Sequence, residues 1–81
     1  MQKTTLGIRK YLNGRYQAAI VDFNAAITSK PNYALAYYNR GRAYLALKQN
    51  REALQDFTQA LMLNPSFKQA ERAKAYPGFS S

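Results

Sequence analysis

The sequence predicts an all-α fold of about five helices, arranged as antiparallel helix-turn-helix repeats, and two observations support this. Small and apolar residues recur every three or four positions on both sides of a polar break at 48–51, as in two amphipathic helices. A shift of the chain by 34 positions superposes the same residue type at seven places: Gly7 on Gly41, Ala19 on Ala53, Asp22 on Asp56, Phe23 on Phe57, Ala26 on Ala60, Pro31 on Pro65 and Ala36 on Ala70. Such self-similarity is typical of repeat proteins.

Each expected helix is bounded by a turn or by a helix-breaking residue. Asn13 and Gly14 mark the turn that ends the first helix. Pro31 and Pro65 cannot continue a helix and disfavour helical geometry in the residue before them, so they end the second and fourth helices. The expected helices span approximately residues 2–13, 16–29, 33–47, 51–63 and 67–76.

Polar residues at three helix starts are expected to cap the free N–H groups of the first turn. Asn32 is expected to cap the third helix and Asn50 the fourth. Ser66 and Gln69 form a candidate capping box for the fifth helix.

The repeated residues also predict how the helices of one unit pack. Gly7 and Gly41 lack bulk where the two helices of a unit come closest, and Phe23 and Phe57 are expected to fill the space between a unit and its neighbour. Asp22 lies on the same helix as an apolar stripe and is expected to point away from it. These glycine and phenylalanine residues are therefore interpreted as packing residues rather than binding residues.

The predicted domain organisation is a single domain at 1–76 followed by a short tail at 77–81. Within the domain, the first repeat covers about 1–31, the second about 32–65, and a closing helix about 66–76. Because repeat units bury their apolar faces against neighbours, and about three are needed for stability, two repeats and a helix suggest a piece of a longer array or self-association.

The composition excludes most enzymatic chemistry. The chain has no cysteine and no histidine, so it lacks thiolate nucleophiles, zinc-thiolate sites and the commonest general base. The four carboxylates form no recognisable acidic pair, and there is no glycine-rich phosphate loop. We therefore predict no catalytic residue, no metal site and no cofactor.

The charge suggests an acidic partner. Twelve Lys and Arg against four Asp and Glu give a formal net charge of +8. The alternative is that the basic side chains have no specific binding role and only keep the helix surfaces solvated. No stretch approaches the roughly 18 apolar residues of a spanning helix, and no signal peptide is visible, so a cytoplasmic location is expected.

The second unit closely resembles the tetratricopeptide repeat. The aromatic, Gly, Tyr, Ala, Phe, Ala and Pro positions of that pattern are filled here by Tyr37, Gly41, Tyr44, Ala53, Phe57, Ala60 and Pro65. The first unit departs from the pattern at Lys3 and Lys10, where the aromatic residue and the Tyr belong. The resemblance implies a right-handed α-superhelix, an α-solenoid fragment, that acts as a non-catalytic protein-binding scaffold.

The resemblance also implies a concave groove lined by the first helix of each unit. The partner-binding residues expected in this peptide-binding groove are Tyr11, Tyr38, Asn39, Arg42 and Arg72. Their amide, guanidinium and aromatic groups suit an extended acidic segment of a partner protein.

One subclass of the family holds a C-terminal carboxylate with five Lys, Asn and Arg residues. Only Asn39 matches this clamp, since Thr4, Ile8, Gln69 and Ala73 stand at the other four positions. The clamp of that subclass is therefore not expected here.

Two alternatives from other functional classes remain open at this stage. In the first, the chain is an assembly element that pairs with a second copy of itself or extends a longer array. In the second, which the sequence favours less, its basic surface binds nucleic acid. The basic residues are spread over all the expected helices, and no nucleic-acid recognition motif is present.

Overall fold

The computed structural model describes residues 3–75, and this part of the chain contains five helices and no strand. The helices are α1 (Lys3–Leu12), α2 (Tyr16–Ser29), α3 (Ala34–Ala46), α4 (Asn50–Leu63) and α5 (Lys68–Lys74). The prediction of an all-α helical repeat is confirmed. The last residue of the expected closing helix and the expected tail at 77–81 lie outside the described residues.

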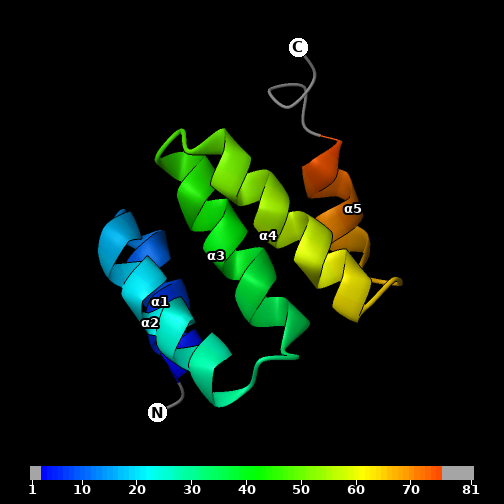
Figure 1. Ribbon diagram of the computed structural model, residues 1–81. Helices are drawn as coiled ribbons and strands as arrows, with labels where there is room; N and C mark the ends of the chain where they lie inside the picture. Colours follow the sequence, from blue (N-terminus) through cyan, green and yellow to red (C-terminus); the bar gives the residue numbers. More distant parts are fainter. Residues whose placement is uncertain (1–2, 76–81) are drawn as a thin grey trace.

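The helices pack in the order in which they occur along the chain. α1 pairs with α2, α3 pairs with α4, and α5 packs against α4 (Figure 1). α3 also packs against α2, so it is the central helix and joins the two repeats. α1 and α3 touch directly as well, which brings the first helices of both repeats to a common surface.

Each repeat is held together by a phenylalanine ring that packs against a glycine. Phe23 and Phe57 are completely buried, as predicted. A Cβ atom on Gly7 would lie 2.5 Å from Cε1 of Phe23, and one on Gly41 would lie 2.7 Å from Cε1 of Phe57. Since real Cβ atoms do not approach carbon this closely, any larger residue at either glycine would push the ring out of place.

The two repeats also end their first helix in the same way. Gly14 and Lys48 occupy equivalent positions, and both have left-handed backbones, with φ of 80° and 62°. The N–H of the following residue then bonds back into the helix: Arg15 to the Lys10 carbonyl at 2.8 Å, and Gln49 to the Tyr44 carbonyl at 2.9 Å. Glycine adopts this conformation without strain, whereas lysine pays a steric cost for it.

The expected N-terminal caps are wrong, and the proline turns explain why. After each proline the chain forms a turn, in which the Tyr33 N–H bonds to the Lys30 carbonyl and the Phe67 N–H to the Asn64 carbonyl. Asn32 and Ser66 lie within these turns. The helices therefore start later, with Tyr33 and Phe67 at the cap positions. Neither Tyr33 nor Phe67 makes a side-chain cap hydrogen bond.

The expected cap of α4 is also wrong. Asn50 is already the first residue of α4, and Gln49 precedes it at the cap position without a side-chain hydrogen bond. In place of the Ser66–Gln69 capping box, the Oδ1 atom of Asn64 accepts a hydrogen bond from the Ser66 N–H at 3.2 Å.

We expect Phe57→Ala to lower the free energy of unfolding by about 3–5 kcal/mol, because it removes a fully buried ring and leaves a cavity beside Gly41. Val21→Ala is the matched control, since Val21 is 65% exposed and its loss should cost less than about 0.5 kcal/mol. Urea unfolding followed by circular dichroism measures both. Similar losses for the two variants would show that Phe57 does not hold the second repeat together.

Candidate functional site

The common surface of α1 and α3 carries an arginine that lies between two tyrosine rings. The guanidinium carbon of Arg42 is 4.7 Å from the ring centroid of Tyr11 on α1 and 5.6 Å from that of Tyr38 on α3. Both distances are within the range of cation–π attraction. We call these three residues the Arg42 cluster. All three were predicted to share a binding face, and the structure brings them together.

The guanidinium of Arg42 is held in place but has no acceptor. Arg42 is only partly buried, and it makes no hydrogen bond or ion pair with any residue in 3–75. A guanidinium has five N–H donors in a planar arrangement that matches a carboxylate. The cluster can therefore offer a pre-positioned cation to an acidic group at little additional cost in side-chain entropy.

The other two predicted binding residues lie differently. Asn39 is only 4% exposed, so the expectation that it lies off the core is wrong. Its Nδ2 atom is buried without a hydrogen-bond partner among the described residues. Arg72 is exposed on α5, and the structure shows no contact between it and the Arg42 cluster. As expected from the sequence, neither Arg42 nor Arg72 is buried.

A second arginine on α3 is fully engaged within the protein. Arg40 donates from Nε and Nη2 to the two carboxylate oxygens of Asp56 on α4, at 2.8 and 2.6 Å, and from Nη1 to the Oδ1 atom of Asn24 on α2, at 2.9 Å. The guanidinium carbon of Arg40 also lies 5.4 and 5.8 Å from the ring centroids of Tyr37 and Tyr44. The hydrogen bond from Arg40 to Asn24 joins the two repeats. The sequence did not predict these contacts of Arg40.

Both repeats bury their aspartate beside a cation of their own first helix. Asp22 is 6% exposed and pairs with the Nζ of Lys10 at 2.8 Å, so the expectation that it points away from the core is wrong. Burial raises the pKa of the Asp56 carboxyl, and the hydrogen bonds from Arg40 act in the opposite direction. The hydrogen bond to Asp56 raises the pKa of the Arg40 guanidinium in turn. Because Asp22 and Asp56 occupy equivalent positions in the two repeats, the sequence could have indicated that both have the same structural role.

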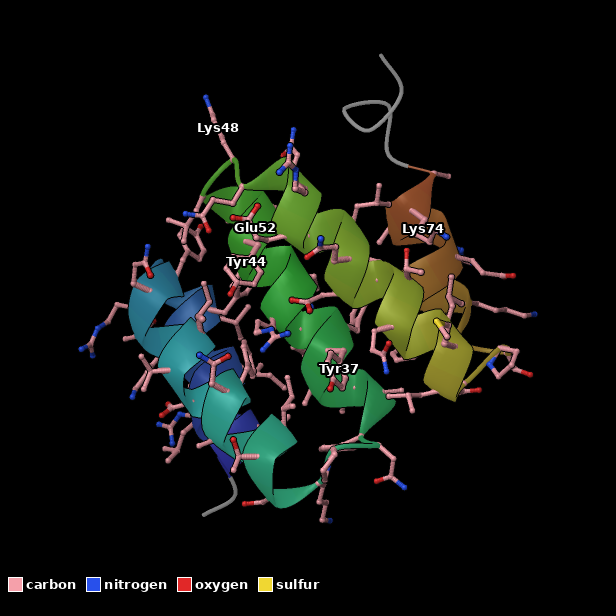
Figure 2. All side chains as sticks on the ribbon, viewed as in Figure 1. Tyr37, Tyr44, Lys48, Glu52 and Lys74 are labelled. Carbon is pink, nitrogen blue, oxygen red and sulfur yellow. The ribbon has the colours of Figure 1, made fainter. Side chains whose placement is uncertain are left out.

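These two ion pairs leave the rest of the surface strongly basic. With one lysine and one arginine paired to the two aspartates, ten basic residues remain against Glu52 and Glu71. Lys48, for example, projects into solvent from the turn between α3 and α4 (Figure 2). The net charge of +8 is therefore carried by residues that these buried pairs do not neutralise.

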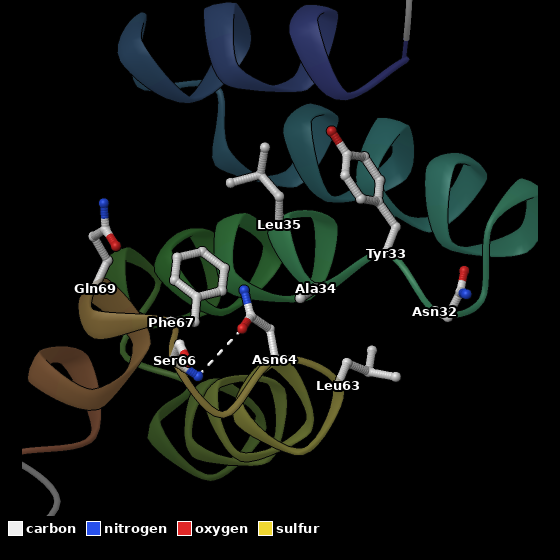
Figure 3. Close-up of a pocket in the computed structure, with 9 residues that line it drawn as sticks. All are labelled: Asn32, Tyr33, Ala34, Leu35, Leu63, Asn64, Ser66, Phe67 and Gln69. Atoms are coloured by element: carbon white, nitrogen blue, oxygen red, sulfur yellow. Dashed lines mark hydrogen bonds between the residues drawn. The ribbon is translucent and has the colours of Figure 1, made fainter.

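A pocket opens next to the Arg42 cluster. It lies between the start of α3 and the loop from α4 to α5, and its volume is about 650 Å³ (Figure 3). Leu35 and Phe67 are among its apolar lining residues, and Gln69 lines it from the first turn of α5. The Phe67 ring packs against that of Tyr38, with centroids 5.0 Å apart, so the pocket and the cluster are contiguous.

Comparison with known proteins identifies the repeat. A family model described as "Tetratricopeptide repeat" matches residues 34–67, and a second, described as "TPR repeat", matches residues 7–48. The chain belongs to the tetratricopeptide repeat family. The first match covers the second predicted repeat, and the second match joins the first repeat to α3.

Related tetratricopeptide repeats occur within much longer proteins. The tetratricopeptide repeat and J domain-containing co-chaperone DNJ1 of Cryptococcus neoformans is 39% identical over 67 residues, which are 83% of this chain and 13% of that protein. Human tetratricopeptide repeat protein 6 is 37% identical over 62 residues, which are 76% and 12% of the two chains. The serine/threonine-protein phosphatase T of Trypanosoma brucei brucei is 35% identical over 54 residues, 67% and 11%.

The chain thus spans about an eighth of the length of these relatives. Its family assignment makes it a protein–protein interaction module of the helical-repeat type. None of the helices within residues 3–75 has the length and apolar character that crossing a membrane requires.

We expect Arg40→Ala to lower the free energy of unfolding by about 2–3 kcal/mol, because it leaves the buried Asp56 carboxylate without its donors. Asp56→Ala removes the buried charge itself. The double variant should therefore lose less free energy of unfolding than the two single variants lose in sum. Arg51→Ala is the control for an exposed arginine. Additive losses in urea unfolding would show that the pair is not coupled.

Proposed function

We propose that this tetratricopeptide repeat chain is a non-catalytic module that binds an acidic, extended segment of a partner protein across the common surface of α1, α3 and α5. The observation that carries the proposal is the Arg42 cluster. Its guanidinium is fixed by Tyr11 and Tyr38, yet all of its donors lack acceptors among residues 3–75. A carboxylate of the partner supplies the missing acceptor.

The remaining predicted residues act around this contact. Arg72 on α5 is exposed and adds a second cation for the segment. The amide of Asn39, three residues before Arg42 on α3, is buried below the surface. It donates a hydrogen bond to the partner only if the neighbouring side chains move aside. Tyr11 and Tyr38 supply flat contact area at low cost in side-chain entropy.

The overall charge supports the same partner chemistry. The basic residues outside the buried pairs outnumber the glutamates five to one, which favours association with acidic segments and disfavours basic ones. The cytoplasmic location suggested by the sequence remains a prediction, which imaging of the tagged protein tests.

The proposal is tested with a random peptide display library, which samples partner segments without prior selection. We expect selection on the wild-type protein to enrich peptides rich in Asp and Glu. Arg42→Glu should weaken binding of the best such peptide by about 1–3 kcal/mol, roughly five- to 150-fold, since an attractive contact becomes repulsive. Fluorescence anisotropy measures the affinity, and circular dichroism confirms that the variant is folded.

Arg51→Glu is the matched control, because it makes the same charge change at an exposed position on α4. It should weaken binding less than about threefold, since a distant surface charge is screened by salt. Equal effects of the two variants would show that net charge alone drives binding, as in the nucleic-acid alternative. No effect of either would move the site away from α3 and favour the assembly alternative.

A further inference from the structure

The pocket beside the Arg42 cluster is lined by apolar and polar side chains in similar measure. Leu35 of α3, 36% exposed, and the ring of Phe67 are both among its lining residues (Figure 3). Leu63 lines it from the end of α4. The side-chain amides of Asn64 and Gln69 lie on either side of the Phe67 ring (Figure 3). An apolar floor with a few polar groups beside it is the usual form of a site that holds one side chain.

The amides are positioned to contact a peptide backbone. The Oδ1 atom of Asn64 accepts the Ser66 N–H at 3.2 Å, and its exposed side-chain amide also has N–H groups that can donate. Figure 3 shows the nitrogen of this amide directed into the pocket beside the Phe67 ring. Gln69 is exposed and can both donate and accept. A strand of partner backbone offers the matching carbonyl and N–H groups.

The pocket is also joined to the cation by a continuous row of rings. Phe67 contacts Tyr38 at a centroid distance of 5.0 Å, and Arg42 lies 5.6 Å from the Tyr38 ring. An extended chain advances about 3.3–3.6 Å per residue, so these two steps correspond to about three residues of a bound segment. A segment whose carboxylate reaches Arg42 therefore passes the mouth of the pocket.

We propose that the pocket holds one apolar side chain, of leucine or phenylalanine size, from the acidic segment that binds Arg42. This inference rests on the proposed function and adds a specificity rule to it. The recognised segment carries an acidic residue and an apolar residue within about three positions of each other. Charge complementarity selects acidic segments in general, and the pocket selects among them.

The test uses the best peptide from the display selection. We expect that peptide to contain an apolar residue within three positions of a Glu or Asp. Replacing this apolar residue with serine should weaken binding to the wild-type protein at least tenfold. With Leu35→Gln as the receptor, the same replacement should matter less than threefold, because the pocket floor is no longer apolar. Met62→Gln, at a residue 72% exposed on α4, is the control and should keep the tenfold effect.

A second measurement does not depend on a variant that folds. In the wild-type protein, the methyl resonances of Leu35 should shift on addition of the apolar peptide and stay in place with its serine version. Peptides that depend on Arg42 but bind equally with serine, or that leave the Leu35 methyls unmoved, overturn the pocket and leave the proposed function standing. Binding that does not depend on Arg42 overturns the proposed function, and the pocket proposal with it.

Discussion

The contact between a phenylalanine ring and a glycine is the constraint on which the rest of the structure depends. Phe57 packs so closely on Gly41 that no side chain fits between them, and Phe23 does the same at Gly7. Each contact fixes how near the two helices of a repeat approach. The Tyr38 ring in turn packs against the buried Phe57 ring, with centroids 5.8 Å apart, and Arg42 lies 5.6 Å from the Tyr38 ring and 4.7 Å from the Tyr11 ring of α1.

Two arginines on the same helix show how neighbours decide the role of a residue. Arg40 donates two hydrogen bonds to Asp56 within its own repeat and one to Asn24 of the first repeat. Arg42, two residues later, lies beside the Tyr11 and Tyr38 rings, which attract its charge but leave its N–H groups without acceptors among residues 3–75. The first arginine therefore serves stability, and the second is the basis of the proposed interaction. The charge of the chain alone does not distinguish them.

The sequence predicted the features that depend on residue spacing. It did not predict the helix caps, which depend on turn geometry, or the burial of Asp22, which depends on a residue of another helix. Helical periodicity and the 34-residue repeat were enough to place the five helices and the buried Phe57. The caps failed because the proline turns shift each helix start past Asn32 and Ser66. The burial of Asp22 depends on Lys10, on another helix, and no local pattern shows such a pair.

The pocket could not be predicted for a similar reason, since its walls come from two chain segments about 30 residues apart that only the fold brings together. By contrast, Tyr11, Tyr38 and Arg42 were assigned to one face from the resemblance to the family, and their contacts agree with that placement. Their role in binding is still a proposal. The resemblance therefore predicts a shared face, whereas the packing of the chain determines which side chains on that face have donors without acceptors among residues 3–75.

The most direct test of the central claim is the NMR signal of the Arg42 side chain in the free protein. If the guanidinium is held between two rings before any partner binds, the ring currents of Tyr11 and Tyr38 should move its Hε and δ-methylene resonances upfield of their ordinary positions. Tyr11→Leu should return them part of the way, while Tyr16→Leu should not. Ordinary shifts for Arg42 in the wild-type protein would contradict the claim that the surface is pre-formed.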